Sequence, residues 1–329
     1  MNPKSDLDRE HGAVRDAEVI DVQVEEGAEI SPAAELPRPA DTAQTRPDLG
    51  PPAPGPQSTN QPGSGLGLVI SVAIAAAVFA ISIYAAGAPT ANPLPLAQTT
   101  NALYWIVGAA ATVAAGVGAV YSDRTASRAK EREHLDRPTA TTAWIIPVVA
   151  TATAVVLVAT FHNRSMFVVG PLIAFLGNAG ALLSRDLLDD ADDSAQRTAT
   201  TIHTVVIHAV AFFALTAIYL NKMTTPVTAL LAAVVTALLA VETLERSSVD
   251  AARKITMALL AGGAVAAASV PLMWWPTHGL TGGGVLFVVF YLAIGIIQTG
   301  VERRGWLPRD GILYGLVPLA MFILLVITA

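Results

Sequence analysis

Two histidines lie inside one apolar run, "TTIHTVVIHAVAFFALTAIY", at positions 203 and 208. Imidazole nitrogens bind metals and haem iron, and two histidines on one helix share a metal when they are three or four residues apart. His203 and His208 are five apart, so their side chains point about 140° apart around a helix. The other four histidines lie outside the apolar runs, so a haem would lack a second imidazole ligand. The sequence therefore predicts no metal site and no cofactor.

The two histidines also differ in depth. His203 lies within one turn of the predicted membrane boundary, where we expect it to reach water or to pair with an aspartate of the acidic run 185–197. His208 lies about 12 Å from that boundary, with Thr204 one turn earlier on the same helix face. A polar side chain at this depth is a functional candidate, although a hydrogen bond across helices, to Asn178 of "FLGNAGALL", explains it equally well. His208, Thr204 and Asn178 are the candidate embedded site.

A second group of polar residues lies at the end of another apolar run, in "VETLERSS". Glu242 and Arg246 are four residues apart, so they can form an ion pair along one helix face at the membrane interface. We group Glu242, Glu245 and Arg246 with His203 as a candidate cytoplasmic interface. The chain has no cysteine and no GxSxG, HExxH or paired acids within an apolar run, which makes an enzyme the less favoured class.

The composition predicts helices in a membrane as the elements that carry these residues. The chain of 329 residues is 53% hydrophobic and 14% charged, well below the roughly 25% charge of soluble domains. A bilayer core of about 30 Å needs about 20 apolar residues in a helix. We predict an all-α, polytopic integral membrane bundle, residues 65–329, of about nine transmembrane helices in antiparallel hairpins. The predicted spans are 66–86, 102–121, 143–161, 166–184, 200–220, 225–242, 255–273, 280–298 and 311–328.

The basic residues predict the orientation of these spans, because Lys and Arg are retained on the cytoplasmic side. The connections that follow spans two, four, six and eight hold thirteen basic residues, whereas the opposite connections hold only Arg164 and Lys222. The sequence therefore predicts a multi-pass protein of the cell membrane with a cytoplasmic amino terminus and a carboxyl terminus outside. Its richness in alanine suggests a bacterial inner membrane.

Residues 1–64 are acidic and rich in proline, with few large apolar side chains, so we predict a disordered cytoplasmic tail. One segment differs, "EVIDVQVEE", which contains Val19, Ile20, Val22 and Val24. The alternation of Ile20, Val22 and Val24 with polar residues is typical of a strand, and such a segment can add to the sheet edge of a partner protein. The alternative is a few aliphatic residues in a solvated tail.

Small residues at a spacing of four predict close helix contacts, because helices in lipid meet through small side chains. The rows are Ala110, Ala114 and Gly118; Gly170, Ala174 and Asn178; Gly262 and Ala266; and Gly263 and Ala267.

The favoured function is a non-catalytic membrane protein that acts as a scaffold, a regulator or a subunit of a complex. Its partners would be the lipid bilayer and a protein bound by the tail, and not a nucleic acid. The alternative is a transporter or channel for a small or lipid-like molecule, since coupled ion transport normally uses an embedded acid and none is deep in a span. An intramembrane enzyme or a haem protein that uses His208 ranks third.

Overall fold

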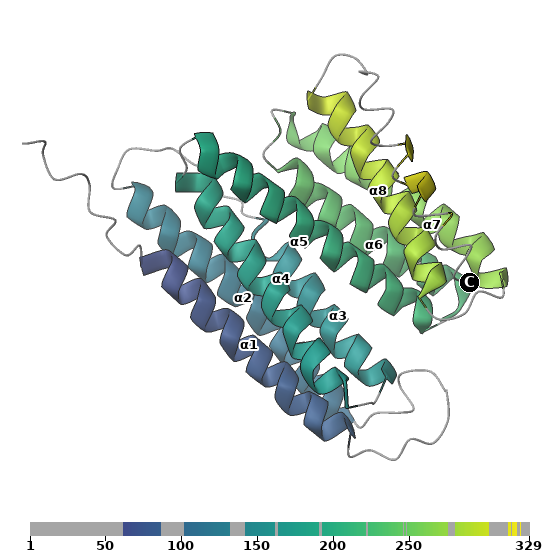
Figure 1. Ribbon diagram of the computed structural model, residues 1–329, viewed down its shortest axis with the longest axis horizontal. Coiled ribbons are helices and arrows are strands. Elements are labelled where there is room, and N and C mark those ends of the chain that lie inside the picture. Colours follow the sequence, from purple (N-terminus) through teal and green to yellow (C-terminus); the bar gives the residue numbers. More distant parts are fainter. Residues whose placement is uncertain are drawn as a thin grey trace, which may run out of the picture. The chain divides into compact units, whose positions relative to one another are not determined.

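Eight α-helices make up most of the chain that the computed structural model describes (Figure 1). The described residues are 62–86, 102–131, 142–161, 164–190, 193–221, 223–245, 247, 249–275 and 280–302, with six more between 315 and 323. The helices are α1 (Pro62–Ala86), α2 (Ala102–Glu131), α3 (Ile145–Phe161), α4 (Met166–Asp190), α5 (Asp193–Leu220), α6 (Thr225–Leu244), α7 (Ala251–Trp274) and α8 (Thr281–Glu302). All belong to one unit of the chain, residues 58–329.

Each of the first eight predicted spans corresponds to one of these helices. In the described part of the chain, seven helices are long and apolar enough to cross a membrane, and α3 is a shorter apolar helix of 17 residues. A length of 17 residues lies at the lower limit of the range of about 17–25 seen in transmembrane helices. The all-helical prediction is confirmed for these residues. Nearly all of the tail 1–64, and most of the ninth predicted span, lie outside the described residues.

Helix α5 lies between α4 and α8 in Figure 1 and joins helices α1 to α4 to helices α6 to α8. It packs against α3, α4, α6 and α8, while α1 packs against α2, α3 and α4, and α7 packs against α6 and α8. The largest apolar cluster takes buried side chains from every helix from α3 to α8. The very short connections after α3 and α5 give the expected neighbours, since α3 contacts α4 and α5 contacts α6.

Helices α2, α4 and α5 extend farthest beyond the predicted spans. Helix α2 ends at Glu131, α4 ends at Asp190 and α5 begins at Asp193, so most of the acidic run 185–197 is helical rather than a connection. Leu187 and Leu188 continue the apolar residues of α4 past the predicted end at Ser184. The prediction placed the boundary at the first charged residue, which is why it ended α4 too early.

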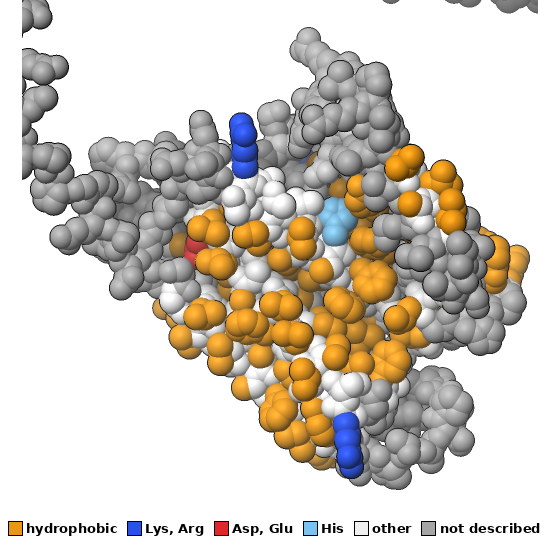
Figure 2. Space-filling model, viewed as in Figure 1, with side chains coloured by type: hydrophobic (Ala, Val, Ile, Leu, Met, Phe, Trp, Pro, Cys, Tyr) orange, Lys and Arg blue, Asp and Glu red, His pale blue; other side chains and the backbone are white. Residues whose placement is uncertain are grey.

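Apolar side chains cover the outside of the helices. Figure 2 shows a face on which hydrophobic side chains predominate, with Lys, Arg, Asp and Glu toward its margins. Exposed apolar residues occur on all eight helices, including Val69 on α1, Val117 on α2 and Leu260 on α7. An apolar exterior on helices of this length is what a bilayer requires, because lipid cannot satisfy exposed polar groups.

The predicted rows of small residues are right in α4 and only half right in α7. Gly170, Ala174 and Asn178 are all buried. Gly262 is buried against α6, where a Cβ atom would lie 2.6 Å from the carbonyl oxygen of Ala233. Gly263, by contrast, is exposed and has nothing within 4 Å of the position of a Cβ atom.

The row predicted in α2 is wrong for Ala110 and Ala114. Its third member, Gly118, is half-buried, and a Cβ atom there would lie 2.7 Å from Cγ2 of Ile70 of α1. Ala110 and Ala114 are exposed, whereas the buried row is Ala111, Ala115 and Ala119. Two overlapping rows of small residues in an alanine-rich helix carry the same pattern, so spacing alone does not select the face that packs.

The neighbouring glycines of α7 allow a matched test of this packing. We expect Gly262→Ala to destabilise the protein by about 1–3 kcal/mol, because the new methyl group would collide with backbone that cannot move aside. Gly263→Ala is the control and should leave the stability unchanged or slightly raised. The measurement is unfolding of the full-length protein in detergent and SDS, followed by circular dichroism. Equal effects of the two substitutions would contradict the described contact between α6 and α7.

Candidate functional site

A buried arginine lies at one end of the bundle, where α2, α4 and α6 end and α3, α5 and α7 begin. Arg185 of α4 is only 8% exposed, and Glu242 in the last turn of α6 is 2% exposed. We call Arg185 and the side chains around it the charge centre, and its members are Asp123, Thr142, Arg185, His203, Glu242, Glu245 and Lys254.

Arg185 and Glu242 form the core of the charge centre. The Nε and Nη2 atoms of Arg185 both donate to Oε1 of Glu242, at 3.1 and 2.8 Å. Two donors on one carboxylate hold the guanidinium plane in a fixed orientation, which a single contact would not do. The pair therefore links the ends of α4 and α6, which are not neighbours in sequence.

Thr142, just before α3, bridges these two side chains. Its hydroxyl donates to Oε2 of Glu242 at 2.5 Å and accepts from Nη2 of Arg185 at 2.6 Å. Glu245 contacts the same residues, since its Oε2 accepts from Arg185 and its Oε1 accepts from the Thr142 backbone N–H at 3.4 Å. Both carboxylate oxygens of Glu242 therefore accept hydrogen bonds. Hydrogen bonds connect the start of α3 to α4 and α6.

Three further helices contribute polar groups at the edge of the charge centre. Asp123 of α2 lies 3.8 Å from Nη1 of Arg185. His203 of α5 places Nε2 at 3.6 Å from Oε1 of Glu242 and Nδ1 at 2.9 Å from the Ser184 hydroxyl. Lys254 of α7 donates from Nζ to the backbone oxygen of Glu245 at 2.7 Å.

The charge centre thus joins six helices through polar contacts. Taking ions out of water costs several kcal/mol each, and the cost is recovered only when the partners and the remaining hydrogen bonds are in place. Three carboxylates surround one guanidinium, and the ammonium group of Lys254 offsets part of the excess negative charge. Chemically, this arrangement is an electrostatic crosslink between helix ends.

Three of the four residues predicted at the cytoplasmic interface meet here, namely Glu242, Glu245 and His203. The fourth, Arg246, lies outside the described residues, so its pairing with Glu242 stays a prediction. The sequence predicts Glu242 at the membrane interface, whereas the structure has it buried among helices.

The sequence reasoning missed Arg185 and Thr142. It counted Arg185 only as a basic residue of a connection, and it gave Thr142 no role. The helical spacing of leucines on both sides of Arg185 was the feature that could have revealed it, because an arginine flanked in this way lies on a packed helix.

Asn178, in the middle of α4, has a partner different from the predicted one. Its amide nitrogen donates to the Thr151 hydroxyl of α3 at 3.0 Å and to the Ala174 backbone oxygen at 2.7 Å. Its amide oxygen has no hydrogen-bond partner in the described part of the chain. The predicted hydrogen bond between Asn178 and His208 is wrong, because Asn178 faces α3 whereas His208 faces α8.

His208 is half-buried and packs against three aromatic rings of α8. Its Nδ1 lies 2.7 Å from the backbone oxygen of Thr204, one turn earlier in the same helix. The imidazole makes edge contacts with Phe287, Phe290 and Tyr291 of α8, with ring centroids 5.5–6.1 Å apart. Of the three members of the predicted embedded site, His208 contacts only the backbone of Thr204, whose side chain is exposed, and Asn178 lies apart.

Two further predictions concern metal binding and the tail segment. No group of three or more His, Asp or Glu that could hold a metal occurs among the described residues. The tail segment with Val19, Ile20, Val22 and Val24 lies outside them.

The charge centre predicts an unequal cost for single and double substitutions. We expect Arg185→Met to destabilise the protein by about 3–5 kcal/mol, because Glu242 would be left buried without its partner. The double variant Arg185→Met with Glu242→Met should lose less than the single variant. Arg253→Gln, at an exposed position of α7, is the control. Unfolding in SDS measures the stability of all three variants. A double variant less stable than Arg185→Met would argue against the pair as the central contact.

The aromatic surroundings of His208 predict that its ring matters more than its nitrogens. We expect His208→Phe to keep near wild-type stability, and His208→Ala to lose about 0.5–3 kcal/mol through the space that it leaves against α8. Thermal unfolding of the full-length protein in detergent distinguishes the two variants. A comparable loss in both would show that the contact of Nδ1 with Thr204 is the important one.

Comparison with known proteins places the chain in a family. No curated protein and no solved structure matches it. A family described as "Protein of unknown function (DUF5656)" matches residues 85–328, about three quarters of the chain, which includes α2 to α8 and the whole charge centre. The chain belongs to this family, DUF5656.

Proposed function

We propose that this protein is a non-catalytic component of a membrane complex, whose bundle presents a rigid polar face to a cytoplasmic partner. The observation that carries the proposal is the charge centre, in which the polar groups of six helix ends bind one another. Polar groups used in this way fix the geometry of a surface. Buried ionic groups can specify one arrangement of helices at some cost in stability, and here they would hold the connections on that face in register.

The distribution of basic residues supports a cytoplasmic location for this face. Arg124, Arg185, Arg253 and Lys254 lie at the same end of the bundle as the charge centre, whereas Arg164 lies at the opposite end, before α4. By the rule that basic residues are retained inside, the charge centre and the amino terminus would face the cytoplasm, and the predicted ninth span would put the carboxyl terminus outside. Helix α1 begins at this same end of the bundle, where Gly67 lies against Ser122 and Leu182, so we assign the tail to the cytoplasmic side as well.

The alternating segment of the tail is the part that we assign to partner binding. The triple variant Ile20→Asn, Val22→Asn and Val24→Asn removes its apolar face, and Asp21→Asn with Glu25→Gln is the control on the alternate positions. We expect the first variant to lower the co-purification of a defined set of membrane or cytoplasmic proteins about tenfold, and the control to leave it unchanged. Quantitative mass spectrometry of crosslinked full-length protein measures this, with the abundance of the bundle recorded in each sample.

Two outcomes would count against the proposal. Identical sets of proteins with both variants would remove the tail as the binding segment. Faster movement of fluorescent phospholipids across vesicles that contain the purified protein, relative to vesicles without it, would replace the scaffold with a transporter of lipid-like molecules.

A further inference from the structure

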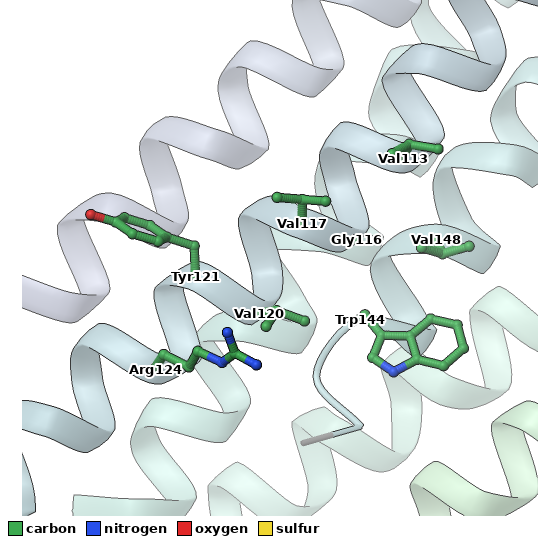
Figure 3. Close-up of a pocket in the computed structure, with 8 residues that line it drawn as sticks. All are labelled: Val113, Gly116, Val117, Val120, Tyr121, Arg124, Trp144 and Val148. Atoms are coloured by element: carbon green, nitrogen blue, oxygen red, sulfur yellow. The ribbon is translucent and has the colours of Figure 1, made fainter. Parts of the chain in front are cut away.

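An apolar groove runs between α2 and α3 on the outside of the bundle (Figure 3). Its volume is about 540 Å³, and it is lined by Val113, Gly116, Val117, Val120, Tyr121, Arg124, Trp144 and Val148. Gly116 allows the two helices to approach closely, since a Cβ atom there would lie 2.7 Å from Cγ2 of Val148. The floor of the groove is therefore formed by glycine, and valine side chains form much of its walls.

The length of the groove matches one leaflet of a bilayer. Val113 and Arg124 are eleven residues apart on α2, which corresponds to about 16 Å along a helix. Half of a bilayer core of about 30 Å is about 15 Å, the depth that one acyl chain occupies. Val113 and Val117 are 63% and 64% exposed, so an acyl chain lying against them would cover apolar surface.

The polar end of the groove has the residues that recognise a lipid headgroup. Figure 3 shows Arg124 and Trp144 at one end of the groove and Val113 at the other. Arg124 is exposed and makes no ion pair with another described residue, whereas the adjacent Asp123 faces Arg185 in the bundle. A guanidinium binds phosphate oxygens through two parallel hydrogen bonds, and Trp and Tyr rings favour the level of the headgroups.

We propose that this groove binds one anionic phospholipid, with an acyl chain along Val113, Val117 and Val148 and the phosphate on Arg124. The positive charge at one end of a leaflet-long apolar surface selects a lipid over a peptide or a second copy of the chain. The anionic headgroup is selected because Arg124 is the charged residue in the lining. This lipid is a resident of the bundle, and its binding is independent of the partner proposed for the tail.

Native mass spectrometry of the full-length protein in a mild detergent tests the proposal. The probes are phosphatidylglycerol and phosphatidylcholine with the same acyl chains. We expect the wild type to bind phosphatidylglycerol about tenfold more tightly than phosphatidylcholine. Arg124→Gln should abolish this preference, and Val117→Trp should weaken the binding of both lipids by filling the groove. Arg253→Gln and Val205→Trp, at exposed positions of α7 and α5, are the matched controls and should behave like the wild type.

Several outcomes would overturn the proposal. Equal binding of the two lipids by the wild type, or an unchanged preference in Arg124→Gln, would remove the headgroup contact. Wild-type binding by Val117→Trp would show that the lipid does not occupy the groove. Val113→Trp, at a second exposed position of the lining, replaces Val117→Trp if that variant elutes as an aggregate, and the same outcomes apply to it.

Discussion

The ion pair between Arg185 and Glu242 is the contact on which the arrangement of the helix ends depends. Apolar packing between helices in lipid is weakly directional, because the tails around the helices are as apolar as the side chains that meet. A guanidinium held by two carboxylates and a hydroxyl has one good geometry. Those contacts fix the ends of α4 and α6 and the start of α3 relative to one another.

The helices themselves could be predicted from the sequence because a membrane allows few alternatives. Backbone polar groups must bond within the helix, so long apolar runs such as 225–242 become helices, as α6 shows. The ends of the helices were less predictable. Charged residues were taken to mark the boundary, yet Arg185 and Glu242 lie inside helices where each neutralises the other. Individual residues do not reveal that compensation, because it depends on two segments 57 residues apart.

Small residues predicted the packed face of a helix only where the alternative rows give the same answer. In α4 the row of Gly170, Ala174 and Asn178 is buried, and Gly177 and Ala181 of the neighbouring row are buried too, so either row gives a packed face. Gly262 and Gly263 offered two rows, and only the contact with Ala233 distinguishes them. The partner of His208 was misassigned for the same reason. Periodicity gives the face on which a residue lies, but the helix that covers this face depends on the order in which helices pack, here α8 over α5.

The position of Thr142 has a consequence for the time course of assembly. Its hydroxyl binds Glu242, which follows it by 100 residues in the chain. Chains are synthesised at about 5–20 residues per second, so Glu242 becomes available about 5–20 s after Thr142. Arg185, the other partner of this hydroxyl, follows Thr142 by 43 residues and is available earlier. During that interval α3, with only 17 residues, is held by apolar contacts with the helices that precede it and with α4. The completion of α6 therefore acts as the late step that locks an early helix in place.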